Sequence, residues 1–139
     1  MPSKRRKAAS RAPRRHAQPI IGCGVDVVEL ARLRQAIARG GDAFLRRVFT
    51  PQEQAYAKAR RQTTLLHLAG RFAAKEAVIK ALSQIDPGHV PTMNQIEIRN
   101  DRLGRPRAVL LDGRRRRLTI HVSLSHVNSV AVASAIVLR

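Results

Sequence analysis

The chain has 139 residues, 44% of them hydrophobic and only 3% aromatic, so it can form one modest aliphatic core and has no room for a second. Its 27 Lys and Arg against nine Asp and Glu give a formal net charge of +18, which attracts anionic partners: nucleic acid, an acidic membrane, an acidic protein or a phosphate-rich small molecule. No apolar run is long enough to span a membrane, and the single cysteine, Cys23, excludes an internal disulfide and a multi-cysteine zinc site. We therefore expect a cytoplasmic protein.

The first 18 residues are expected to form a disordered basic tail, followed by one folded domain over residues 19–139. The tail holds seven basic residues and no acid, shows no hydrophobic period, and lacks the apolar region of a secretory signal. The other 20 basic residues still exceed the nine acidic ones by 11, so the domain is basic in its own right. A solvated tail is favoured over a nucleic-acid-binding arm.

The predicted elements run in the order strand, helices, strands. Gly40-Gly41 is expected to separate the first two helices, and Thr50 with Glu53 three residues later predicts the start of the third. In chain order the elements are a strand at 20–28, helices at 29–39, 42–48, 50–61 and 64–83, and strands at 95–99, 107–111, 118–125 and 130–138. This order predicts an α+β domain with a mainly antiparallel sheet packed against the long helix.

The first candidate site lies in the strand predicted at 20–28. With the period of two of a strand, Asp26 shares a face with Ile20, Gly22, Gly24 and Val28. A carboxylate in that apolar setting is costly to bury unless it is paired or binds a metal. The glycines let another chain segment or a ligand approach the backbone closely. The alternative, that Asp26 caps the following helix, stays open at this point.

The second candidate site is the helical segment from Arg71 to Lys80. Glu76 and Lys80 are four residues apart and share one helix face, and Arg71 and Lys75 share a neighbouring stripe. Mg²⁺ bound to a pyrophosphate requires such an arrangement, because it takes one or two carboxylates and completes its shell with phosphates and water. The spacing alone is more often that of an ordinary salt-bridged helix surface.

A third candidate is His126, which ends the motif Ser-Leu-Ser-His at the end of a predicted strand. A histidine beside hydroxyl groups could carry a proton or contact a phosphate. The commoner alternative is a turn histidine bonded to the backbone.

Together these stretches resemble the holo-acyl-carrier-protein synthase family, the small trimeric branch of the 4'-phosphopantetheinyl transferases. The matching segments are residues 21–30, 47–53, 67–82 and 122–126, and the one around Glu76 is the most specific. The resemblance covers residues 20–138. It implies an enzyme that transfers the 4'-phosphopantetheine group from coenzyme A to a serine of an apo-acyl carrier protein and releases adenosine 3',5'-bisphosphate. It also implies a place in fatty acid or polyketide biosynthesis.

The resemblance further implies a role for individual residues. Asp26 and Glu76 are expected to bind Mg²⁺, and Glu76 and Lys80 to be catalytic. Arg71, Lys80 and His126 are expected to contact coenzyme A. Active sites are expected between the subunits of a homotrimer. Arg32 is expected to dock the acidic carrier protein. Arg46 and Arg47 are expected to join it because of their place on the next predicted helix, and not because of the resemblance.

Some alternatives stay open at the level of sequence. The proton acceptor for the serine hydroxyl is either Glu76 or a metal-bound water. A nucleic-acid-binding module would explain the tail and the basic run 114–117, but not Asp26 or Glu76, which repel phosphate without a metal. Three Phe and one Tyr also offer little surface for base stacking. An inactive carrier-binding scaffold is disfavoured because Asp26, Glu76 and Lys80 are all present.

Overall fold

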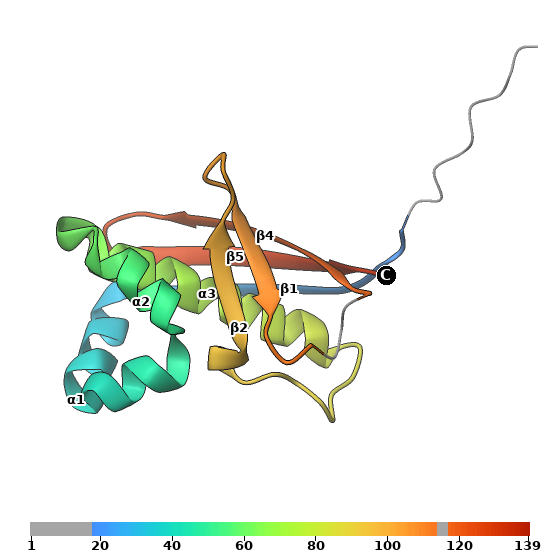
Figure 1. The fold of residues 1–139 in the computed structure, drawn as a ribbon, viewed down its shortest axis with the longest axis horizontal. Helices are drawn as coiled ribbons and strands as arrows, with labels where there is room; N and C mark the ends of the chain where they lie inside the picture. The colour runs from blue at the N-terminus through green and yellow to red at the C-terminus, as the bar shows by residue number, and fades with distance from the viewer. Residues whose placement is uncertain (1–17, 114–116) are drawn as a thin grey trace, which may run out of the picture.

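The computed structural model describes residues 18–113 and 117–139, which form five strands and three α-helices (Figure 1). Their bounds are β1 Ile20–Glu29, α1 Leu30–Val48, α2 Pro51–Lys58, α3 Thr64–Ser83, β2 Ile96–Asn100, β3 Pro106–Leu110, β4 Thr119–His126 and β5 Val130–Leu138, with 3-10 turns at Arg61–Thr63 and Met93–Gln95. The expected basic tail, apart from Gln18, and residues 114–116 of the basic run lie outside the described residues.

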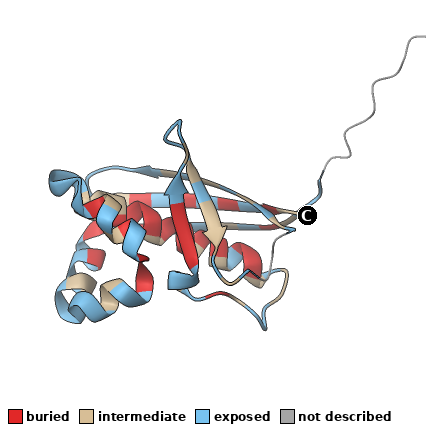
Figure 2. Cartoon of the chain, viewed as in Figure 1, coloured by how far each residue is buried: buried red, intermediate tan, exposed pale blue. Residues whose placement is uncertain are grey.

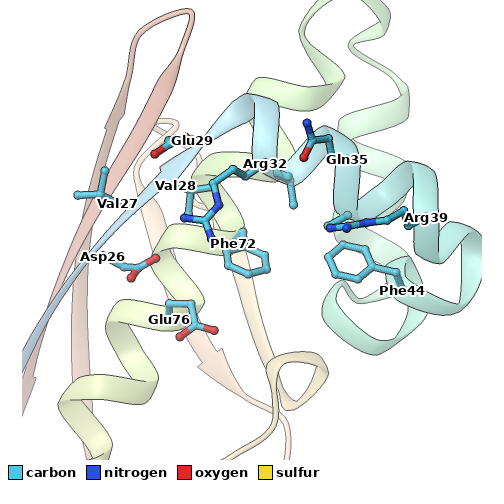
Figure 3. Close-up of a pocket in the computed structure, with 12 residues that line it drawn as sticks. Asp26, Val27, Val28, Glu29, Arg32, Gln35, Arg39, Phe44, Phe72 and Glu76 are labelled. Atoms are coloured by element: carbon cyan, nitrogen blue, oxygen red, sulfur yellow. The ribbon is translucent and has the colours of Figure 1, made fainter.

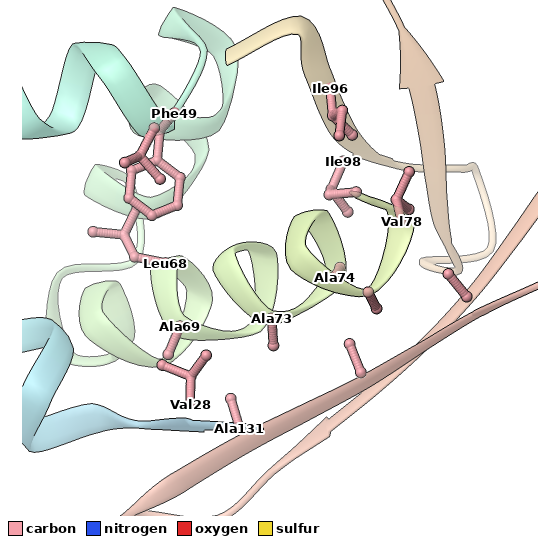
Figure 4. Packing of buried hydrophobic residues seen from close by; sticks show 14 of the residues in the cluster. Val28, Phe49, Leu68, Ala69, Ala73, Ala74, Val78, Ile96, Ile98 and Ala131 are labelled. Carbon is pink, nitrogen blue, oxygen red and sulfur yellow. The ribbon is translucent and has the colours of Figure 1, made fainter. Parts of the chain in front are cut away.

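The strands form one sheet in the order β1-β5-β4-β3-β2, and each neighbouring pair is antiparallel. The predicted α+β class and antiparallel sheet are therefore confirmed. The sheet curls around α3, so that β1 and β5 lie on one side of the helix and β2 on another (Figures 1 and 4). α1 and α2 cover one end of this arrangement.

The core lies between α3 and the inner face of the sheet (Figure 2), and it is built mainly from small residues. Ala77 and Ala81 on α3 are fully buried against β1. A Cβ on Gly24 would lie 2.1 Å from the carbonyl oxygen of Ala77, and one on Gly22 would lie 2.4 Å from that of Ala81. The two glycines therefore permit the close approach expected from the sequence, and the segment that approaches is a helix of the same chain.

The helical boundaries differ from the prediction in two places. The expected break at Gly40-Gly41 is a kink inside α1, where Gly41 has a φ of 54°. α2 begins with the predicted capping box between Thr50 and Glu53, but it ends at Lys58, because a 3-10 turn takes over at Arg61.

The outer face of the sheet carries exposed apolar side chains. Val25 and Val27 of β1 are 58% and 61% exposed, and Val132 and Ile136 lie beside them on β5. The expected alternation along β1 fails only at its start, where a register irregularity leaves Ile20 exposed. This face is a surface that a second protein copy could cover.

Within the described part of the chain, no helix is both long and apolar enough to span a membrane.

Candidate active site

Asp26 of β1 and Glu76 of α3 line the same cavity, which has a volume of about 410 Å³ (Figure 3). The two residues are 50 positions apart in the sequence and meet because Gly22 and Gly24 let α3 pack directly on β1. α1 forms the other wall and contributes Arg32. The cavity thus combines two carboxylates with a guanidinium at its side.

The carboxylates of this cavity are held in different ways. Asp26 accepts a hydrogen bond from the ammonium of Lys80, with Oδ1 and Nζ 2.9 Å apart. Lys80 also donates to the carbonyl oxygen of Val25 at 2.9 Å. Burial raises the pKa of Glu76 above its ordinary value, and the nearby Asp26 raises it further, while Lys80 opposes the shift. The pair of carboxylates therefore favours an additional positive charge.

This donor set fits a magnesium ion that also binds a phosphate ligand. No group of three or more His, Cys, Asp or Glu side chains that could hold a metal occurs among residues 18–113 and 117–139. Two carboxylates leave most of an octahedral oxygen shell to phosphate and water, as is usual for Mg²⁺ at nucleotide sites. Asp26 and Glu76 can supply two of those oxygen ligands because they line one cavity.

A second cavity, of about 210 Å³, is lined by Arg71, His126, His67, Tyr56 and Asn100. Arg71 is buried; its Nη2 donates to Asn100 Oδ1 at 3.1 Å, and its guanidinium lies 3.9 Å from the centre of the Tyr56 ring. Its Nε is buried without a hydrogen-bond partner in the described structure. Burial and the neighbouring Arg71 lower the pKa of His67, so His67 is neutral at pH 7. This cavity suits an anion.

Lys75 does not belong to either cavity. The sequence pattern grouped it with the cations beside Glu76, but its side chain is fully buried and pairs with Glu53 of α2, with Nζ and Oε2 2.5 Å apart. Lys75 also donates to the carbonyl oxygen of Val48 at 2.6 Å. Lys75 therefore cannot reach a phosphate. Among the described residues, the accessible cations near Glu76 are Lys80 and, on α1, Arg32 and Arg39.

The expected docking arginines separate into two groups. Arg32 lines the carboxylate cavity, whereas Arg46 and Arg47 are exposed near the end of α1 and line neither cavity described above. Arg39 lines the cavity with Arg32 and was missed by the sequence analysis. Its signal was available, because residues seven apart share one helix face.

Comparison with known proteins decides the family. The sequence matches the 4'-phosphopantetheinyl transferase superfamily over residues 22–135. It is 40% identical over 121 residues to a holo-[acyl-carrier-protein] synthase of Syntrophus aciditrophicus. The matched region covers 83% of this chain and 93% of that protein. The chain belongs to the holo-acyl-carrier-protein synthase family of 4'-phosphopantetheinyl transferases.

Solved structures of holo-acyl-carrier-protein synthases have the same fold. A synthase from Bacillus anthracis in complex with coenzyme A (3',5'-ADP) superposes with a TM-score of 0.70 at 32% identity, over 86% of this chain and 96% of that one. The synthase–coenzyme A complex of Chronobacterium ammoniagenes gives a TM-score of 0.71 at 33% identity, over 84% of this chain and 96% of that one. Family and fold therefore agree over nearly the whole described chain.

Proposed function

We propose that this chain transfers the 4'-phosphopantetheine group of coenzyme A to a serine of an apo-acyl carrier protein, giving the holo-carrier protein and adenosine 3',5'-bisphosphate. Family membership supports the reaction, and curated relatives are named for it. The structural observation that carries the proposal is the meeting of Asp26 and Glu76 on one cavity beside Lys80.

Asp26 and Glu76 are proposed to hold Mg²⁺. When bound, the ion would neutralise the negative charge of the coenzyme A pyrophosphate and the negative charge that develops on the leaving phosphate. Lys80, half exposed and hydrogen-bonded to Asp26, can turn its ammonium toward that phosphate. The hydrogen bond to Asp26 raises the pKa of Lys80, so the side chain is a cation at neutral pH. The acceptor of the serine proton is Glu76 or a water beside it.

Arg71 and His126 are proposed to bind the nucleotide end of coenzyme A. The buried guanidinium of Arg71 has an Nε without a partner in the described structure, and it lines a cavity with His126. An unpaired buried donor is costly unless a ligand accepts its hydrogen bond. A phosphate oxygen is an acceptor of the right charge.

The two cavities lie on different sides of α3, and this supports a site shared between subunits. Arg71 and Glu76 are five positions apart, so their side chains leave the helix about 140° apart. A homotrimer, with the apolar outer face of the sheet at its interfaces, would place the Arg71 cavity of one subunit against the carboxylate cavity of another. Val25, Val27 and Val132 would then be covered.

The carrier protein is proposed to dock on α1. Arg32 and Arg39 stand at the carboxylate cavity, so acidic residues of a carrier bound there would bring its serine close to the metal site. Arginine suits this task because its guanidinium pairs with a carboxylate through two hydrogen bonds. Arg46 and Arg47 would extend the basic surface along the same element. The cytoplasmic location and a role in fatty acid or polyketide synthesis are part of the same proposal.

Release of adenosine 3',5'-bisphosphate tests this function. The purified chain, incubated with coenzyme A and Mg²⁺, should release the nucleotide only when an apo-carrier protein is added. A carrier whose acceptor serine is replaced by alanine should give no release. Release without a carrier, or equal release with the alanine carrier, would point to a hydrolase and contradict the proposal.

A further inference from the structure

A buried ion pair joins the helices at a point outside both cavities. Glu53 of α2 and Lys75 of α3 have side chains that are 1% and 0% exposed. Lys75 also ties α3 to Val48, the last residue of α1. A buried ion pair often stabilises a protein no more than an apolar pair of the same size, so its value lies in the atoms that it holds in place.

The second oxygen of the Glu53 carboxylate extends this network to the sheet. Oε1 accepts a hydrogen bond from the backbone N–H of Ile98 in β2, at 2.8 Å. β2 is an edge strand, and here the carboxylate takes the place that a neighbouring strand would occupy. Glu53 therefore sets the position of β2 relative to α2.

Glu53 connects α2 with β2, and each of these two elements contributes one residue that contacts Arg71. Tyr56, one turn after Glu53 on α2, supports the guanidinium with its ring face at 3.9 Å. Asn100, two residues after Ile98 on β2, accepts the hydrogen bond from Nη2 at 3.1 Å. Arg71 itself lies one turn before Lys75 on α3. The contacts thus form a closed ring from α3 through α2 and β2 back to α3.

We propose that Glu53 and Lys75 are positioning residues for Arg71, and through it for the phosphate-bearing nucleotide end of coenzyme A. This inference rests on the proposed function. The ion pair lines neither of the two cavities. It holds Tyr56 and Asn100 at the distance that fixes the guanidinium of Arg71, whose buried Nε remains without a partner among the described residues.

Two matched double variants of the full-length protein separate this role from stability. Glu53→Gln/Lys75→Met and Glu53→Leu/Lys75→Met both remove the buried charges, but only the glutamine can still accept from Ile98 N–H. Calorimetric titration with adenosine 3',5'-bisphosphate and Mg²⁺ should show wild-type affinity within about threefold for the glutamine variant. The leucine variant should bind about tenfold more weakly, as expected for one displaced hydrogen bond to a charged group. The KM for the carrier protein should be the same in both.

Equal nucleotide affinity of the two folded double variants would overturn the inference. If the leucine variant does not fold, Asn100→Ala tests the same ring, with Asn94→Ala as an exposed control. Asn100→Ala should weaken nucleotide binding, and unchanged binding overturns the inference. Arg71→Ala distinguishes the two levels of the argument: wild-type binding by this variant would show that the proposed role of Arg71 itself is wrong, whereas weak binding by Arg71→Ala with wild-type binding by Asn100→Ala contradicts the positioning role alone.

Discussion

Lys80 of α3 donates a hydrogen bond to Asp26 of β1 across 2.9 Å, although the two residues are 54 positions apart in the sequence. The same ammonium donates to the backbone oxygen of Val25. One turn later, the Gln84 side chain forms two hydrogen bonds with the backbone of Cys23, at 3.1 and 2.7 Å. α3 therefore fastens the edge strand β1 through its side chains, and this sets the spacing between Asp26 and Glu76 before any ligand binds.

Replacing Lys80 tests its role as a cation for the leaving phosphate. Lys80→Met should lower kcat about 100-fold, the usual cost of removing one group that stabilises transition-state charge. Lys80→Arg keeps the charge and should retain a larger share of kcat. Steady-state kinetics at saturating coenzyme A measure both. A Lys80→Met enzyme with near-normal kcat would show that its contact with Asp26 is structural only.

Removing either carboxylate should abolish metal binding. Mg²⁺ at 100 times its Kd should stabilise the wild-type protein by about 2.7 kcal/mol, because it binds the folded state. Asp26→Asn and Glu76→Gln should lose this rise in Tm together with transfer activity. Asp42→Asn, which changes an exposed acid on α1, is the matched control and should keep both. A normal magnesium-induced rise in either site variant would place the metal elsewhere.

The raised pKa of Glu76 predicts a pH-dependent difference between the wild-type protein and Glu76→Gln without metal. A carboxyl group whose pKa is raised by folding binds more protons in the folded state, so its contribution to stability falls as pH rises through that pKa. The pH window runs from about 4, near the ordinary pKa of Glu, up to neutral pH. As the pH rises through this window, Glu76→Gln should therefore become more stable relative to the wild-type protein. Urea unfolding of the two proteins at each pH measures this. A stability difference between the two proteins that stays constant across this pH range would show that burial and Asp26 do not raise the pKa of Glu76.

Arg32→Glu tests carrier docking against a control on the same helix. Arg34 is also exposed on α1 but lines a different surface from the carboxylate cavity, so Arg34→Glu makes the same charge change away from the site. Arg32→Glu should raise the KM for the carrier protein about tenfold or more, as expected for a charge pair reversed at an interface, and change the KM for coenzyme A much less. If the two variants raise the KM for the carrier protein equally, the carrier is attracted by the overall positive charge of the chain and Arg32 is not a docking residue.

A shared site predicts complementation between two inactive variants. Glu76→Gln and Arg71→Ala damage different cavities, so a mixed oligomer can contain an interface where both cavities are intact. Co-refolding the two variants should restore part of the activity, while each alone stays inactive. Val27→Asp, which places a charge on the exposed sheet face, should give monomers by light scattering and prevent the rescue. A mixture that stays inactive would contradict the shared site, because it would show that the two cavities do not combine across an interface.

The sequence predicted the fold well because its signals are local. The alternation at 130–138 and the capping box at Thr50 each predict one element, and those elements formed. The close packing of α3 on β1 was also readable in outline, because glycines at alternate strand positions leave space for a backbone. The kink at Gly41 was read as a helix end, since a glycine pair looks the same in both cases.

The site was harder to predict because its partners are distant in sequence. Spacing grouped Lys75 with Arg71, but its partner Glu53 lies 22 positions earlier and buries it. Nothing in a helical pattern shows that Asn100, on a strand formed much later, will hold Arg71. Arg39 was missed for a different reason: it shares a face with Arg32, but that face acquires meaning only when α1 is placed beside Asp26.

The central claim is that Asp26 and Glu76 form the metal site of a phosphopantetheinyl transferase, and intact mass of the carrier protein tests it most directly. A panel of apo-carrier proteins from fatty acid and polyketide synthesis would be incubated with coenzyme A, Mg²⁺ and either the wild-type chain or Glu76→Gln. The account predicts that at least one carrier gains the mass of a single phosphopantetheinyl group with the wild-type chain, and that none does with Glu76→Gln or after chelation of the metal. Unchanged carrier masses throughout the panel with the wild-type chain, or a full mass gain with Glu76→Gln, would contradict it.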